Sequence, residues 1–396
     1  MQSSTSNLIV PEASDVSTYG DFIDPDDYDI LEHYSEDMDE HEYYPICLGE
    51  IVEKRYRVVH KLGHGAFSTV WLAHDLEKNV DVALKIMTAD CEWNHEFRMQ
   101  NEIIRRLKDT TDTSNLLLYQ DTFSLRGRDR DRDHRVLVFP VRGPSLSSHH
   151  TGRMSMATRM SAAKQLLKAL ESLHGCGIIH GDVSGGNVLW DMVPLDKYNT
   201  ATKYKYLGRP EKAALRPRAW KAGELVSEAE IPQSLLRAKV YLCDFGLATN
   251  ANNQIMNKWR PTWEYCAPER MHKFPASFAG DMWGYMCIFT SLYFRHSIFS
   301  RGLDAIVAVL GPMPKEWKGL KEKPEDEWYD QNMSVDTKEV LERKFKLELA
   351  DVSTAERGHI ISIILAVLRY RPGERLTATQ LLHHPSFKAV MNIYCP

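Results

Sequence analysis

Residues 180–187 read HGDVSGGN, and the apolar residues 188–190 follow them directly. Asp182 and Asn187 lie five residues apart in this segment, on a loop that its three glycines allow to turn tightly. A carboxylate and an amide placed in this way can direct two oxygen ligands into one cavity. We therefore predict a ligand-binding loop that leads into a buried strand.

Two strand-like segments with a glycine-rich turn between them lie upstream of this loop. Residues 56–62 alternate between apolar and polar, residues 63–68 read GHGAFS, and residues 69–73 form a second strand-like run. The glycines allow backbone N–H groups to approach phosphates closely. A glycine turn between two strands differs from the strand-to-helix turn of a dinucleotide-binding fold. Taken alone, the motif also fits an ordinary hairpin.

A lysine ends a third strand-like segment, and a helix is expected after it. Residues 82–85 read VALK, and apolar residues recur near helical spacing over 92–108. A fourth apolar strand, 136–139, precedes the short segment 140–143, and residues 155–174 have the periodicity of an amphipathic core helix. The chain therefore reaches the loop after a strand-rich first part and a helix.

Two short motifs follow the loop. Residues 240–243 read as a strand and lead into DFG at 244–246, and APE follows at 267–269. An apolar helix that reads as buried begins at Asp281. Each motif is common by itself, but the whole series in this order is not expected by chance.

Composition indicates a globular protein of two or three domains or lobes. Hydrophobic residues make up 43% of the 396 residues and charged residues 26%, which is enough for a sizeable core. Seven cysteines are scattered without C-x-x-C pairs, which favours a reducing compartment over a disulfide frame or zinc site. No apolar run reaches bilayer length and no secretory signal is evident. We expect a cytoplasmic and nuclear location.

Charge is distributed unevenly along the chain. Fifteen acidic residues and no Lys or Arg precede Lys54, so the remainder carries about +10. Residues 1–45 read as a disordered acidic tail, and docking of this tail on a basic surface is the alternative. Residues 195–239 hold ten Lys or Arg against five acids and read as an insert. Two interpretations of the insert stay open: a variable solvated loop, or a segment that anchors the protein to an acidic partner or controls traffic between nucleus and cytoplasm. Both predict that deleting 197–237 leaves basal catalysis intact.

From about residue 42 to 388 the chain resembles the eukaryotic protein kinases, and among them the SR-protein kinases, as a divergent fungal-type member. The glycine-rich segment 61–73 carries the likeness to that subgroup, together with 43–50 and 55–59. The resemblance implies an α+β, bilobal kinase fold with a small β-rich N-lobe, one key helix and a larger, mainly helical C-lobe. The implied boundaries are an N-lobe at 46–139, a C-lobe at 140–390 that contains the insert, and a tail at 391–396.

The resemblance also implies roles for individual residues. Asp182 orients or deprotonates the substrate hydroxyl, Asn187 and Asp244 hold Mg²⁺, and Thr262 braces Asp182. Lys85 fixes the phosphates and pairs with an acid on the next helix, for which we chose Glu102 over its competitor Glu96. The implied ATP-binding residues are Leu62, Gly63, His64, Gly65, Ala66, Phe67, Ser68, Val70, Ala83, Lys85, Phe139, Val141, Asn187, Leu189 and Asp244.

Three positions depart from the family pattern. Ser184 stands where serine/threonine kinases usually have a lysine near the transferring phosphate. Gly181 replaces an arginine that usually pairs with a phosphate on the activation segment, so we expect no dependence on phosphorylation there. Cys266 replaces an arginine that helps to set substrate preference, which weakens the case for Arg-Ser repeats.

The leading hypothesis is a monomeric, Mg²⁺- and ATP-dependent, non-specific serine/threonine protein kinase. Its expected partners are protein substrates, and Arg-Ser-rich RNA-processing proteins are one class of them. We expect it to bind neither nucleic acid nor a membrane. Because Ser184 and Ser68 replace family residues, a pseudokinase scaffold that binds nucleotide or partners is the alternative. A small-molecule kinase of similar fold is a third.

Overall fold

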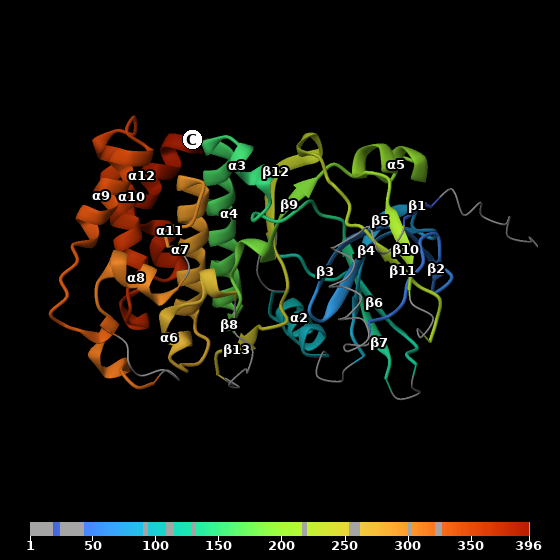
Figure 1. The fold of residues 1–396 in the computed structure, drawn as a ribbon, viewed down its shortest axis with the longest axis horizontal. Coiled ribbons are helices and arrows are strands. Elements are labelled where there is room, and N and C mark those ends of the chain that lie inside the picture. Colours follow the sequence, from blue (N-terminus) through green and yellow to red (C-terminus); the bar gives the residue numbers. More distant parts are fainter. Residues whose placement is uncertain are drawn as a thin grey trace, which may run out of the picture. The chain divides into compact units, whose positions relative to one another are not determined.

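A computed structural model describes residues 19–23, 43–89, 94–107, 115–128, 132–215, 220–252, 262–299, 302–320 and 327–395. The chain forms two compact units (Figure 1). Unit 1 comprises residues 1–93, 119–141 and 193–235, and unit 2 comprises 94–118, 142–192 and 236–396. Among the described residues, no helix is long and apolar enough to cross a membrane.

Unit 1 is built on a six-stranded antiparallel sheet in the order β2-β3-β4-β5-β7-β6. Its strands are β2 (Ile51–Val52), β3 (Tyr56–Gly65), β4 (Ser68–Asp75), β5 (Val80–Met87), β6 (Asp121–Leu125) and β7 (His134–Pro140). Alternating apolar residues on these strands, among them Val58, Trp71 and Leu84, form its buried core. The strands expected around the glycine turn, before Lys85 and at 136–139 are all present.

The basic insert forms helix and strand and groups with unit 1, which corrects the solvated-loop interpretation. It contains α5 (Thr200–Leu207), β10 (Glu211–Ala214), β11 (Glu224–Val226) and the 3-10 turn η5 (Gln233–Leu235). Two of its lysines are buried in ion pairs. Lys203 lies 2.5 Å from Asp81, and Lys212 lies 2.9 Å from Glu224. Deletion of 197–237 would remove the buried cation from Asp81 and leave it the His74 ring at 2.8 Å, so we now expect the deletion to destabilise unit 1.

Part of the predicted disordered tail is also ordered. Strand β1 (Asp21–Phe22) pairs in parallel with β10, and Arg209 binds Asp21 at 2.8 Å. Tyr43 and Pro45 are buried against unit 1. Residues 1–18 and 24–42 lie outside the described residues, so the prediction of disorder applies only to them.

Unit 2 is mainly helical, and α4 and α7 lie side by side in its core (Figure 1). Helix α4 begins at Met156, where the Ser155 side chain accepts a hydrogen bond from the Thr158 N–H. The helices are α2 (Asn94–Leu107), α3 (His149–Arg153), α4 (Met156–Gly175), α6 (Pro268–Met271), α7 (Phe278–Phe294), α8 (Leu303–Leu310), α9 (Thr337–Glu348), α10 (Thr354–Val367), α11 (Ala378–His383) and α12 (Pro385–Tyr394).

Two short antiparallel sheets lie in the same unit. Strand β9 (Val188–Met192) pairs with β12 (Leu236–Leu242), and β8 (Ile178–Ile179) pairs with β13 (Thr249–Asn250). Short 3-10 turns complete the unit: η4 (Gly185–Asn187), η6 (Trp263–Tyr265), η7 (Lys315–Trp317), η8 (Glu327–Tyr329) and η9 (Pro372–Glu374). The β9–β12 pair positions the polar loop with which the sequence analysis began.

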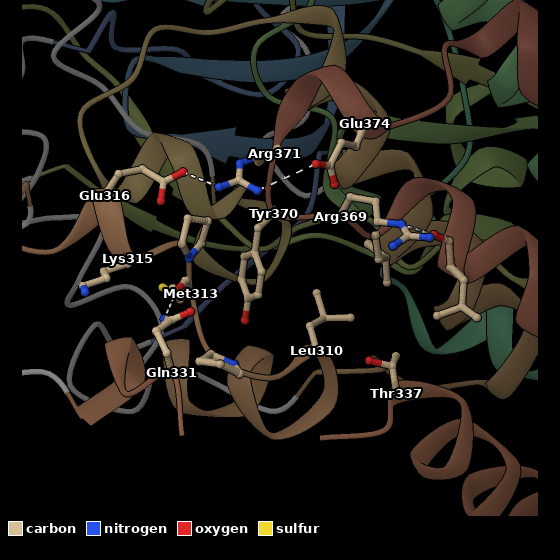
Figure 2. A pocket seen from close by; sticks show the side chains of 14 residues that line it. Leu310, Met313, Lys315, Glu316, Gln331, Thr337, Arg369, Tyr370, Arg371 and Glu374 are labelled. Atoms are coloured by element: carbon tan, nitrogen blue, oxygen red, sulfur yellow. Dashed lines mark hydrogen bonds and ion pairs between the residues drawn. The ribbon is translucent and has the colours of Figure 1, made fainter. Parts of the chain in front are cut away.

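A pocket of about 320 Å³ lies beyond the C-terminal end of α8 (Figure 2). The Tyr370 hydroxyl donates a 2.6 Å hydrogen bond to the Gly311 carbonyl on one side of it. The guanidinium of Arg371 lies between two carboxylates, 2.5 Å from Glu316 and 3.9 Å from Glu374. The charge of Arg371 is therefore balanced within the pocket.

Candidate active site

The predicted catalytic loop folds as a link between β8 and β9 in unit 2. The Asn187 side-chain amide donates hydrogen bonds to the Asp182 carboxylate (2.8 Å) and to the Asp182 carbonyl (2.9 Å). This leaves the amide oxygen of Asn187 available as a ligand. The other carboxylate oxygen of Asp182, Oδ1, is buried and has no hydrogen-bond partner among the described residues. A buried oxygen of this kind suits an incoming hydroxyl or cation.

The environment of Asp182 makes its carboxylate unusually basic. Burial raises its pKa, and the nearby charge of Asp244 raises it further. His180, the Asn187 amide and the main-chain N–H of Thr262 act in the opposite direction, but the net shift is upward. The Thr262 contribution comes from its backbone, while its side chain is exposed. That Thr262 braces Asp182 stays a prediction.

Asp244 is brought to the same loop by the β9–β12 pair. Strand β12 ends at Leu242, and the Cys243 N–H donates a 2.9 Å hydrogen bond to the Asn187 carbonyl. The Asp244 backbone has φ +63°, a left-handed conformation that is uncommon for residues other than glycine. Strain of this kind is often found at functional sites. The backbone bond between Cys243 and Asn187 thus joins the segments that carry Asn187 and Asp244, whose oxygens are ligands of the kind that Mg²⁺ takes together with phosphates and water.

Asp281 positions the loop, a role that the sequence analysis missed. Its side chain is 2% exposed and accepts hydrogen bonds from the His180 N–H (2.8 Å), the Gly181 N–H (2.9 Å) and the His174 ring (2.9 Å). An acid at the start of an apolar, buried helix was the available signal, because such a group needs partners. Gly181 has φ +78°, and a Cβ there would lie 2.6 Å from the Leu247 carbonyl. The backbone therefore explains why arginine is absent from position 181.

Unit 1 contains the predicted ATP-site residues from Leu62 to Val141, whereas Leu189 lies on β9 in unit 2. Val70 pairs with Lys85 across β4 and β5, and Ala83 pairs with Phe139 across β5 and β7. Opposed residues, and residues two apart on one strand, point to the same side of a sheet. Val70, Ala83, Lys85 and Phe139 therefore share one face, as an adenine and phosphate site requires.

The glycine-rich turn is held by two segments from outside the strands that form it. Gly65 pairs with Ser68 across the turn, and the Tyr43 hydroxyl donates a 2.7 Å hydrogen bond to the Gly65 carbonyl. The His64 ring lies 2.7 Å from the Glu228 carboxylate of the insert. The insert also meets β3 through its backbone, where the Ala229 N–H donates to the Lys61 carbonyl at 2.9 Å. The turn is thus tied to the insert and to the segment before β2.

Glu102, the predicted partner of Lys85, forms ion pairs within its own helix. Both carboxylate oxygens of Glu102 accept hydrogen bonds from its own helix, from Arg105 (2.8 and 2.9 Å) and Arg106 (2.6 Å). These arginines lower the pKa of Glu102 to about 2. Glu96 is 2% exposed and accepts a 3.0 Å hydrogen bond from Gln100. The acid that pairs with Lys85, Glu102 or its competitor Glu96, stays a prediction.

Comparisons with known proteins place the chain in a family. The protein kinase domain model matches residues 56–387. The chain is 26% identical to the serine/threonine-protein kinase SRPK of Physarum polycephalum, over 92% of each protein. It is 24% identical to the probable serine/threonine-protein kinase clkA of Dictyostelium discoideum, but this match covers 88% of the chain and only 37% of that relative.

A yeast relative and a solved structure agree with this assignment. The serine/threonine-protein kinase SKY1 of Saccharomyces cerevisiae is 34% identical over 38% of the chain and 22% of its own length. A crystal structure of a kinase domain matches the fold with a TM-score of 0.60 and 19% identity, over 87% of the chain and 98% of that structure. These relatives do not test a fungal origin, which stays a prediction. The chain belongs to the protein kinase domain family and is an SRPK-like serine/threonine kinase.

Proposed function

We propose that this chain transfers the γ-phosphoryl group of Mg²⁺-ATP to serine or threonine hydroxyls of proteins, with Arg-Ser-rich proteins as one substrate class. The observation that carries the mechanism is the pair formed by Asp182 and Asn187, which leaves a buried, unpartnered carboxylate oxygen beside Asp244. The Arg-Ser preference rests on the names of relatives, which include SRPK and SRSF protein kinase 3. The pseudokinase alternative receives no support from the comparisons.

The proposed mechanism assigns a task to each group. Oδ1 of Asp182 accepts the hydrogen bond of the substrate hydroxyl and orients it, while Asn187 holds the rest of the carboxylate in place. Asn187 and Asp244 would hold Mg²⁺, which neutralises phosphate charge when it is bound. Lys85 and the glycine-rich turn would hold the phosphates. The protein then contributes positioning and charge stabilisation and forms no covalent intermediate.

Labelled phosphate transfer from ATP tests the proposal directly. We expect incorporation into an Arg-Ser peptide that requires Mg²⁺ and stops when EDTA is added. A Lys-Ser peptide of equal charge serves as the matched substrate for the Arg preference. If neither peptide nor a mixed protein substrate is labelled, phosphoryl transfer by this chain is excluded under those conditions of assay.

We further propose that the protein acts as a monomer in the cytoplasm and nucleus. The support is its scattered cysteines, six of which are described and free of disulfides. The pairing of β1 with β10 of the insert within one chain also supports a monomer.

Substitution of Ser184 by lysine is expected to raise turnover. Ser184 is 4% exposed, directly before η4, and supplies a hydroxyl where the family usually supplies a charge. The attraction between a preorganised cation and the transferring phosphate is stronger in the transition state than in the ground state. We therefore expect Ser184→Lys to raise kcat about tenfold. Ser184→Met has similar length without charge and is the control. An equal kcat in both variants and the wild type would show that the missing charge does not limit the rate.

Loss of the contact between the insert and the glycine-rich turn is expected to weaken ATP binding. His64 and Glu228 are both partly exposed, so the loss of their contact should have a modest effect. We expect Glu228→Gln to raise the KM for ATP roughly two- to fivefold and to leave kcat nearly unchanged. Hydrogen bonding to His64 holds the pKa of Glu228 below its usual value, so the contact weakens as acid protonates this carboxylate. Glu230→Gln removes an exposed acid two residues away and should leave KM unchanged. Equal KM values in the two variants would contradict the contact's role.

A further inference from the structure

A second pocket, of about 290 Å³, lies beside the catalytic loop within unit 2. Arg159 on α4 and Arg295 at the C-terminal end of α7 line it, together with Ser147 and His149. Gly185 and Tyr265 form another part of its wall. The pocket therefore combines two guanidinium groups with a residue of the loop that contains Asp182.

Arg159 is a buried cation whose charge is not balanced. It is 2% exposed, and its Nη1 donates to the carbonyls of Leu292 and, at 3.4 Å, Tyr293, so that it caps the last turn of α7. Its Nε is buried without a hydrogen-bond partner among the described residues. Helix capping accounts for Nη1 but leaves Nε unexplained.

Arg295 adds a second positive charge to the same pocket. Burial lowers the pKa of Arg159, and the charge of Arg295, which lines the same pocket, lowers it further. In the described part of the chain, no carboxylate forms an ion pair with either of them. Arg371 in the pocket of Figure 2 is different, because Glu316 and Glu374 balance its charge. One buried and one exposed guanidinium line the same cavity, and neither is paired with a carboxylate in the described part of the chain, so the cavity suits an anion.

The position of the pocket indicates where that anion comes from. A Cβ on Gly185 would lie 2.6 Å from the Ser147 hydroxyl and 2.8 Å from the Tyr265 hydroxyl, so the loop packs directly on the pocket wall. Gly185 follows Asp182 by three residues, which limits the separation of their Cα atoms to about 11 Å. An extended peptide advances roughly 3.4 Å per residue. A side chain two to four residues from the reacting hydroxyl can therefore reach the pocket.

We propose that this pocket binds a phosphate or carboxylate group of the substrate polypeptide, two to four residues from the hydroxyl that is phosphorylated. The inference rests on the proposed function, because it assumes a peptide bound at Asp182. It adds a substrate rule that the relatives' names do not contain: an acidic or already phosphorylated residue is favoured near the target serine, and an arginine at that place is disfavoured.

Peptide binding to the Asp182→Asn variant of the full chain tests the pocket without requiring phosphoryl transfer. A series of fluorescent peptides is prepared around one target serine, which is position 0. In each peptide, one position from −4 to +4 carries phosphoserine, aspartate or asparagine. Binding is followed by fluorescence anisotropy. We expect the phosphoserine or aspartate peptide to bind at least about tenfold more tightly than the asparagine peptide at one position or more. Arg295→Asn and Arg159→Gln should each abolish this preference.

Three arms of the experiment separate the possible causes. Arg295→Asn suits the left-handed backbone at φ +70° and should preserve folding, so it decides the question even if Arg159→Gln unfolds. Arg153→Asn removes an exposed nearby cation that does not line the pocket and should keep the preference. Inorganic phosphate should compete only at much higher concentration than the phosphopeptide.

Each remaining outcome would overturn the proposal. The proposal fails if no acidic peptide binds more tightly than the asparagine peptide, or if the preference survives Arg295→Asn. It also fails if inorganic phosphate binds to the protein but the phosphopeptide does not. A wild-type protein that transfers no phosphate would refute the proposed function, while the binding comparison would still decide the pocket.

Discussion

Asp182→Asn is expected to lower kcat about a thousandfold while leaving the fold intact. The replacement keeps the shape of the side chain and a partner for Asn187, but it removes the carboxylate oxygen that would orient and deprotonate the substrate hydroxyl. Proton acceptance by a positioned group typically contributes a factor of about 10²–10⁴. The measurement is steady-state phosphate transfer with both substrates saturating.

Stability should move in the opposite direction to activity in this variant. The pKa of Asp182 is raised in the folded protein, so its ionised form is less favourable there than in the unfolded chain. Stability contributed by this group is greatest when it is protonated and declines as pH rises towards its folded pKa. At neutral pH the neutral asparagine avoids that penalty, and we expect an unchanged or higher melting temperature.

The pH dependence provides an independent check. If Asp182 must be ionised to act, kcat/KM should fall on the acid side at a pH above the usual range for an aspartate. The residual activity of Asp182→Asn should lack this acid limb. A variant that retains full activity, or that loses it only because it unfolds, would remove Asp182 from the mechanism.

Local periodicity predicted most of the strands because they alternate and are bounded by turn residues. It also shows that Glu96 and Glu102 lie on different faces of their helix. Glu96, Gln100, Ile103 and Leu107 follow one helical stripe and are all buried, whereas Glu102 is rotated by about 100° from Ile103. Adjacency to apolar residues was a poor guide, because neighbours in sequence do not share a helix face.

The folded insert could not be predicted in the same way. Lysine-rich composition normally indicates a solvated segment, and Lys203 and Lys212 are buried only because acids lie opposite them. One of these acids, Asp81, is 122 residues away in the sequence. Contacts at that separation depend on tertiary structure, and local pattern contains no record of them. The catalytic residues were easier because their motif keeps them together on one short loop.

The ion pair between Glu269 and Arg375 is expected to give the largest stability effect in unit 2. Arg375 donates from Nη1 to Glu269 at 2.7 Å and from Nη2 at 2.6 Å, and both side chains are at most 2% exposed. Its other N–H groups reach the carbonyls of Ala279, Tyr370 and Arg369. This one side chain therefore joins the APE motif to the segment before α11.

Removing either partner should destabilise unit 2 by about 3–5 kcal/mol, because it leaves the other charge buried and unpaired. For a unit of this size the melting midpoint of Glu269→Ala or Arg375→Ala should fall by roughly 10 °C. Differential scanning calorimetry of the full chain measures the shift. The control is Glu339→Ala, which breaks an ion pair with Arg343 in which each side chain is 69% exposed. This control should not move the melting midpoint. Glu269→Leu combined with Arg375→Met buries no charge and should recover much of the loss. If each single variant melts like the control, the buried pair does not stabilise this unit. If the double variant is as unstable as the single variants, the hydrogen bonds of Arg375 to the three carbonyls contribute more stability than its ion pair with Glu269.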